Sequence, residues 1–118
     1  DVLWLRYITV RHDRRGEGVG PRLARFVAER ARDRGYETVQ IAVNNPFAFE
    51  ALYRAGFGYT GDQTGVAELV LAFPSARPPE SYRAGLDVYR ERDLSDAEEQ
   101  FLAARSDATP PAVVDAPR

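Results

Sequence analysis

The 118-residue sequence predicts an α/β (α+β) fold with a mixed β-sheet and elements in the order β-α-β-α-β-β. Two observations predict this class. An almost continuously apolar run is followed by a polar, glycine-rich connection and then by apolar residues at helical spacing. The change from strand to helix is then repeated once before residue 56. Alternation of this kind gives parallel strands joined by crossover helices.

The first strand, helix and second strand have recognisable boundaries. Residues 2–10 (VLWLRYITV) are rich in β-branched and aromatic side chains, which is typical of a strand buried on both faces. A helix is predicted over 21–34, since Pro21 suits a first helical turn and Gly35 suits the position after the end. Residues 38–43 (TVQIAV) form the second strand. The side chains at helical spacing, expected on the inner face of the helix, are Leu23, Phe26, Val27, Arg30 and Ala31.

The remaining elements of the sheet unit are shorter. Residues 47–55 predict a helix that Gly56 ends. Residues 57–60 and 67–73 predict a pair of strands around a turn, G-D-Q-T-G, at 61–65.

A helical C-terminal extension follows the sheet unit. Helices are predicted over 80–92 and 96–105, and Ser95 with Glu98 forms a capping box for the second. The sequence therefore divides into a sheet unit at 1–73, a helical extension at 74–107 and a tail at 108–118 that we expect to be disordered.

Composition excludes several kinds of chemistry. The chain has no Cys, so disulfides, a thiolate nucleophile and a Cys-based metal site are unavailable. All sixteen basic residues are arginine, which excludes a lysine Schiff base and the lysine of a Walker loop. The net charge is −2, which gives no reason to expect nucleic-acid binding. No segment has the pattern of a membrane span or a signal peptide, and we expect a cytoplasmic location.

The glycine-rich connection is the main functional signal in the sequence. It reads R-R-G-E-G-V-G over residues 14–20, directly before the predicted helix. A Walker loop would need a lysine, and a GxGxxG fingerprint fails in both possible registers. A third pattern, [QR]-x-x-G-x-[GA], is met by Arg15, Gly18 and Gly20.

A glycine-rich loop directly before a helix can bind a diphosphate group. The N-terminus of a helix presents unpaired N–H groups and a partial positive charge. Glycines let backbone N–H groups turn inward without a Cβ in the way, and Arg14 and Arg15 add forked donors. The alternative interpretation is a tight surface turn with solvated arginines.

The motif order resembles the second half of the GNAT superfamily of acetyl-CoA-dependent N-acetyltransferases, over roughly residues 2–73. The matching motifs are V-R-H-D-R-R-G-E-G-V-G, the later Asn45, and Gly56-Phe57 opening the next strand. The resemblance implies that an acceptor amine attacks the thioester of acetyl-CoA directly within a ternary complex, without a metal.

The resemblance also implies cofactor contacts. In the family, the first strand of this unit and the strand after the helix splay apart around the pantetheine arm. The main chain of Ile8 and Val10 would then bind that arm, and an N–H near Ile8 would polarise the thioester carbonyl. Asn45 would touch the cofactor, or would instead cap the helix that starts at Pro46. The full predicted set is Ile8, Val10, Arg14, Arg15, Gly16, Gly18, Val19, Gly20 and Asn45.

The sequence departs from the family at the proton donor. Many members have a tyrosine seven residues after the asparagine, where it protonates the leaving thiolate, but this chain has Leu52 there. Tyr53 is the next residue, about 100° further round a helix. We predict Tyr53 as the general acid, with packing in the core as the alternative. No general base can be named, since residues 2–10 contain no Asp or Glu and the single histidine, His12, is expected to be solvated.

The family elements that precede this unit and shape the acceptor pocket have no counterpart here. We therefore expect a piece of a longer protein, or a homodimer, in which the first strand is covered. Two other classes of function remain open: a non-catalytic acyl-CoA-binding or regulatory module, and a protein-interaction domain that uses the charged C-terminal segment and binds no cofactor.

Overall fold

A computed structural model describes residues 2–5, 19–105 and 109–113, although the side chains of residues 19 and 20 are not described. The predicted order of elements is confirmed, including the helical extension. The elements are β1 (Val2–Leu5), α1 (Val19–Asp33), β2 (Thr38–Val43), α2 (Pro46–Arg54), β3 (Gly58–Gln63), β4 (Leu69–Phe73), α3 (Pro79–Arg90) and α4 (Asp96–Ala103).

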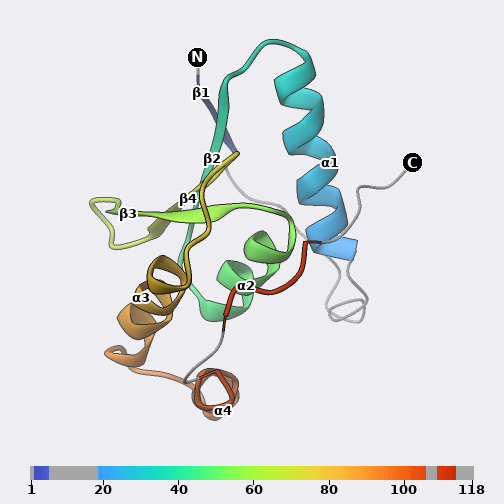
Figure 1. The fold of residues 1–118 in the computed structure, drawn as a ribbon. Coiled ribbons are helices and arrows are strands. Elements are labelled where there is room, and N and C mark those ends of the chain that lie inside the picture. The colour runs from blue at the N-terminus through green and yellow to red at the C-terminus, as the bar shows by residue number, and fades with distance from the viewer. Residues whose placement is uncertain (1, 6–18, 106–108, 114–118) are drawn as a thin grey trace.

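The four described strands form one mixed sheet in the order β1-β2-β4-β3 (Figure 1). β1 and β2 are parallel, from Val2 opposite Thr38 to Leu5 opposite Ile41. β4 is antiparallel to both β2 and β3. The α/β (α+β) class with a mixed sheet is therefore confirmed. Residues 6–10 of the predicted first strand lie outside the described part of the chain.

α1 is the crossover between the two parallel strands and runs antiparallel to β2 (Figure 1). It begins at Val19, two residues earlier than predicted, and Pro21 still lies in the first turn, where no backbone donor is lost. The helix ends at Asp33, and Gly35 follows with a φ of 99°.

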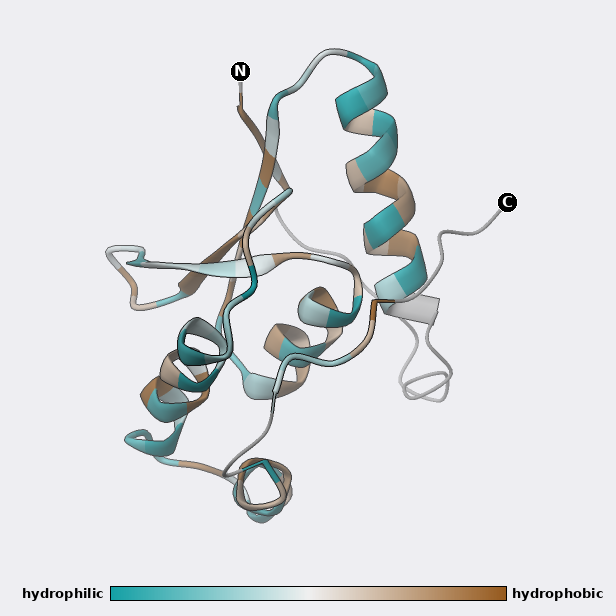
Figure 2. Ribbon diagram, in the orientation of Figure 1, coloured by the Kyte–Doolittle hydropathy of each residue, from teal (hydrophilic) through white to brown (hydrophobic). Residues whose placement is uncertain are grey.

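The predicted inner face of α1 was wrong in part. The buried residues are Pro21, Ala24, Ala28 and Ala31. Leu23 and Phe26 are each 39% exposed, and Arg30 is exposed as well. Small alanines let the helix axis approach the sheet closely, so the larger apolar side chains lie outside the contact. Hydrophobic residues dominate β1, while those of α1 alternate with hydrophilic ones (Figure 2).

The hairpin between β3 and β4 also differs from the prediction. Gly61, expected in the turn, lies inside β3 with a φ of 89°, and the register shifts between Tyr59 and Gln63. A left-handed residue inside a strand is accommodated as a bulge, so the strand continues beyond it. The turn instead follows at 64–68, where the Thr64 N–H donates to the Glu68 carbonyl at 2.8 Å.

The extension is packed into the core of the sheet unit. The ring of Phe49 on α2 lies within 6.0 Å of those of Tyr82 and Tyr89 on α3. A Cβ at Gly85 would overlap the Phe49 ring, so only glycine allows this approach. The capping box of Ser95 and Glu98 is present at the start of α4, as predicted.

Part of the predicted tail contacts the connection between β4 and α3. Residues 109–113 are described, and the Pro111 carbonyl accepts a hydrogen bond from Arg77 Nη2 at 2.9 Å. Residues 108 and 114–118 of the predicted tail lie outside the described residues. The division of the chain at 73 and 107 stays a prediction.

Candidate functional site

The topology brings two predicted site segments to one edge of the sheet. Parallel strands end at the same edge, and a crossover helix starts there because it runs antiparallel to them. The start of α1 at Val19 and the connection after β2, which contains Asn45, therefore share the edge at which β1 and β2 end. Ligands of open α/β sheets bind at this edge.

The start of α1 has the electrostatics of an anion site. The helix is 15 residues long, and its first turn contains no acidic residue. The exposed Arg22 adds a positive charge in that turn. The helix dipole favours a negatively charged group at this end.

Most of the predicted cofactor contacts cannot be placed. Val19 and Gly20 are the first two residues of α1, as expected for a loop that leads into a helix. The others before them lie outside the described residues: Ile8, Val10, Arg14, Arg15, Gly16 and Gly18. Their cofactor contacts stay predictions.

Asn45 caps α2. Its Oδ1 accepts the N–H of Ala48 at 2.8 Å, its backbone is extended, and Pro46 follows at the first helical position. The capping role considered from the sequence is confirmed. The side chain is exposed at the same edge of the sheet, and its contact with a cofactor stays a prediction.

Tyr53 lies in the core, with 0% of its surface exposed. Its hydroxyl accepts the N–H of Tyr59 at 2.9 Å, and its ring packs against Phe49 and Tyr82. Burial raises the pKa of Tyr53. Leu52, which occupies the family's tyrosine position, is also buried. This packing supports the core alternative for Tyr53, and its role as general acid stays a prediction.

Replacing Tyr53 with phenylalanine separates the two roles. The substitution leaves the buried N–H of Tyr59 without its partner, so we expect the free energy of unfolding to fall by about 1–3 kcal/mol. A tyrosine that only packs in the core leaves kcat unchanged on this substitution between pH 6 and 9, about the range over which a raised tyrosine pKa keeps the group neutral. Urea unfolding and a pH–rate profile measure the two effects. A large fall in kcat at unchanged stability would instead establish the general acid.

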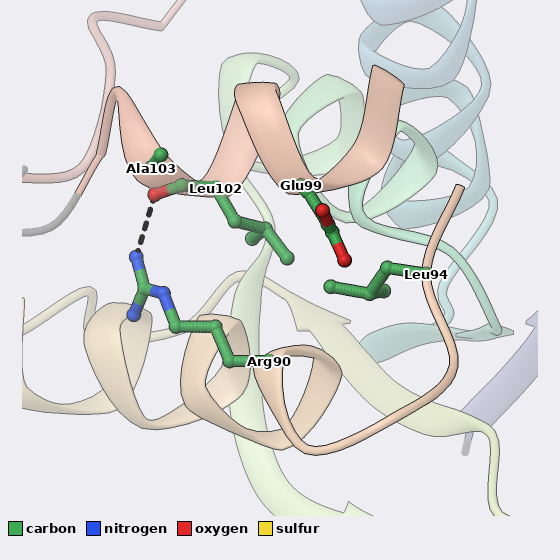
Figure 3. Close-up of a pocket in the computed structure, with 5 residues that line it drawn as sticks. All are labelled: Arg90, Leu94, Glu99, Leu102 and Ala103. Atoms are coloured by element: carbon green, nitrogen blue, oxygen red, sulfur yellow. Dashed lines mark hydrogen bonds between the residues drawn. The ribbon is translucent and has the colours of Figure 1, made fainter. Parts of the chain in front are cut away.

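A shallow groove of about 230 Å³ lies between α3 and α4 and is lined by Arg90, Leu94, Glu99, Leu102 and Ala103 (Figure 3). Arg90 Nη2 donates to the Leu102 carbonyl at 2.9 Å, and Nη1 pairs with Asp87 at 2.5 Å. The Arg90 guanidinium therefore links α3 to α4, and its hydrogen bonds to protein groups leave it poorly suited to bind an anion.

Two further findings concern the described residues only. No group of three or more acidic or histidine side chains among them could hold a metal ion. None of the helices in the described ranges has both the length and the apolar character that crossing a membrane requires.

Three arginines of the helical extension at 74–107 were missed in the sequence analysis. Arg77, Arg92 and Arg105 contact α2 or the residue before its cap, and their partners lie 24 to 55 positions away. No local pattern distinguishes such residues from solvated arginines, so only the tertiary structure identifies them.

A parallel β-α-β unit continued by an antiparallel hairpin defines a mixed α/β protein. Comparison with known families narrows this class. The model of the Acetyltransferase (GNAT) family matches residues 1–59, which is half of the chain. The chain therefore belongs to the GNAT acetyltransferase family. No curated protein and no solved structure matches it. The family match ends in β3, so β4, α3 and α4 lie beyond it.

Proposed function

We propose that this chain binds acetyl-CoA and transfers its acetyl group to an acceptor amine. The observation that carries the proposal is the start of α1 at Val19, within the last two residues of R-R-G-E-G-V-G, at the edge where the parallel strands end. The loop and the first turn of α1 would bind the diphosphate, with Arg14 and Arg15 as charged donors. Membership of the GNAT acetyltransferase family supports an acyl group as the group that is transferred.

The proposed reaction is a direct transfer. The amine nitrogen attacks the thioester carbonyl carbon, the C–S bond breaks, and the amine proton is lost while the thiolate of coenzyme A gains one. An N–H near Ile8 would stabilise the developing oxyanion. Binding both substrates in one complex would supply much of the acceleration through orientation.

The proposal includes an assembly and a location. β1 is an edge strand among those described, and its Val2 and Trp4 side chains are 47% and 53% exposed. Elements that precede β1 in a longer protein, or a second copy of the chain, would cover this edge. The same proposal includes a cytoplasmic location, where acetyl-CoA is available as a substrate.

A second candidate is a non-catalytic acyl-CoA-binding or regulatory module. It is favoured by Leu52 at the tyrosine position and by the buried hydroxyl of Tyr53. Such a module would bind acetyl-CoA without releasing coenzyme A.

An acetyl-transfer assay separates the two candidates. The chain is incubated with acetyl-CoA and a panel of amines: a peptide with a free N-terminus, an aminoglycoside, a polyamine and small primary amines. We expect thiol release and an acetylated product with at least one amine. Binding without transfer across the panel would favour the module, and the absence of binding would refute both.

A further inference from the structure

Three arginines of the segment beyond the family match hold the α2 region at its beginning, middle and end. Arg92 contacts Asn44 before the helix, and Arg105 contacts Glu50 at 2.9 Å within it. Arg77 contacts the Tyr53 carbonyl at 2.7 Å near its end. We propose that this segment positions the β2–α2 connection for acyl-CoA binding, and that Arg92 is the main positioning residue. The inference rests on the proposed function.

Arg92 joins two connections at one edge of the sheet. One of its terminal nitrogens donates to Asn44 Oδ1, and the other donates to the Ala67 carbonyl at 2.6 Å. Asn44 follows β2, and Ala67 lies in the turn before β4. Since Val43 pairs with Leu69, both connections lie at the edge where β2 ends. The planar guanidinium fixes both partners in one geometry, which an ammonium does not do.

Tyr89 supports the same connection from α3. Its ring is buried and lies 5.3 Å below the Arg92 guanidinium, measured from the ring centre. Its hydroxyl donates to the Val43 carbonyl at 3.2 Å. Two consecutive residues before Asn45, namely Val43 and Asn44, are therefore held from the end of α3.

The position of Asn45 depends on this support. The connection between β2 and α2 consists of Asn44 and Asn45 alone, and both are exposed. Asn45 Oδ1 bonds to Ala48, and its carbonyl accepts the Phe49 N–H at 3.1 Å. These bonds fix Asn45 relative to α2, whereas Arg92 and Tyr89 fix the connection relative to the sheet. A displacement of about 1 Å at such a site can lower a rate by about a hundredfold.

The test compares Arg92→Ala, Arg92→Lys and Asn44→Ala with a matched control, Arg83→Ala. Arg83 lies on α3, two to three turns before Arg92, and its Nε donates to the Pro79 carbonyl one turn earlier at 3.3 Å. We expect Arg92→Ala to raise Kd and KM for acetyl-CoA by about tenfold, with KM for the acceptor unchanged. Asn44→Ala should reproduce most of this effect, and the double variant should be no worse than Arg92→Ala, since both substitutions remove the same bond between Arg92 and Asn44.

Two comparisons exclude a merely structural or electrostatic role. Arg92→Lys keeps the charge but not the paired geometry, so it should restore little of the affinity. Hydrogen exchange of the Ala48 and Phe49 amides should accelerate in Arg92→Ala but not in Arg83→Ala, with or without acetyl-CoA. Equal exchange and equal Kd in these two variants, or full rescue by lysine, would overturn the inference. If the wild-type chain does not bind acetyl-CoA, the proposed function fails, and the exchange comparison still decides whether Arg92 holds the connection.

Discussion

Replacing Phe49 with alanine is expected to lower the free energy of unfolding by about 3–5 kcal/mol, the range for a buried phenylalanine. The side chain has no exposed surface. Its ring centre lies between 4.9 and 6.0 Å from the ring centres of four tyrosines on α2, β3 and α3, namely Tyr53, Tyr59, Tyr82 and Tyr89. The substitution therefore leaves a cavity where the sheet unit meets the extension.

Phe47 provides the matched control on the same helix. It is 37% exposed, and its ring packs on Phe101 at 4.8 Å. Because half-exposed apolar area contributes less, we expect Phe47→Ala to cost about 1 kcal/mol. Urea unfolding followed by circular dichroism measures both variants. Equal losses, or a Phe49→Ala protein in which only α3 and α4 unfold, would contradict a single core shared by the two segments.

Alkaline pH is expected to destabilise the fold steeply. Burial raises the pKa of Tyr53, Tyr59, Tyr82 and Tyr89 above the ordinary value of 10.0. Above that pH the unfolded chain releases these four protons while the folded chain keeps them, so stability is full below pH 10 and falls as the pH rises. Each tyrosine contributes a slope of at most about 1.4 kcal/mol per pH unit, or at most about 5–6 kcal/mol per unit together.

Urea unfolding at a series of pH values from 8 to 11, about one unit on the alkaline side of the tyrosine pKa, measures this slope. Tyr89→Phe should remove about a quarter of the slope, since it deletes one of the four groups. A stability that stays constant through pH 11 would contradict the burial of these hydroxyls.

Local patterns predicted the order of the elements because each start and stop signal acts within a few residues. Asn45 and Pro46 determined the start of α2, and Ser95 with Glu98 determined the start of α4. The buried face of α1 could not be predicted in the same way. Which stripe of a helix is buried depends on how closely it approaches the sheet, and here Ala24 and Ala28 make the contact instead of Phe26.

The sequence predicts a site where the main chain would carry the chemistry, and it does not reveal contacts that depend on packing. The loop over 14–20 is recognisable because glycines directly before a helix have few other uses. The burial of Tyr53 depends on Tyr82, which comes from a helix beyond the family match. The contact between Arg92 and Asn44 spans 48 positions and has no sequence signature.

Calorimetric titration with acetyl-CoA tests the central claim, that the main chain at 14–20 and the start of α1 bind the diphosphate. The wild-type chain is compared with Gly18→Asp, which places a side chain and a negative charge in the loop, and with Gly65→Asp. Gly65 is the matched control, because nothing lies within 4 Å of a Cβ there. We predict saturable binding to the wild type and to Gly65→Asp, and at least about a hundredfold weaker binding to Gly18→Asp. Equal binding by Gly18→Asp and the wild type, or no binding by the wild type, would contradict the account.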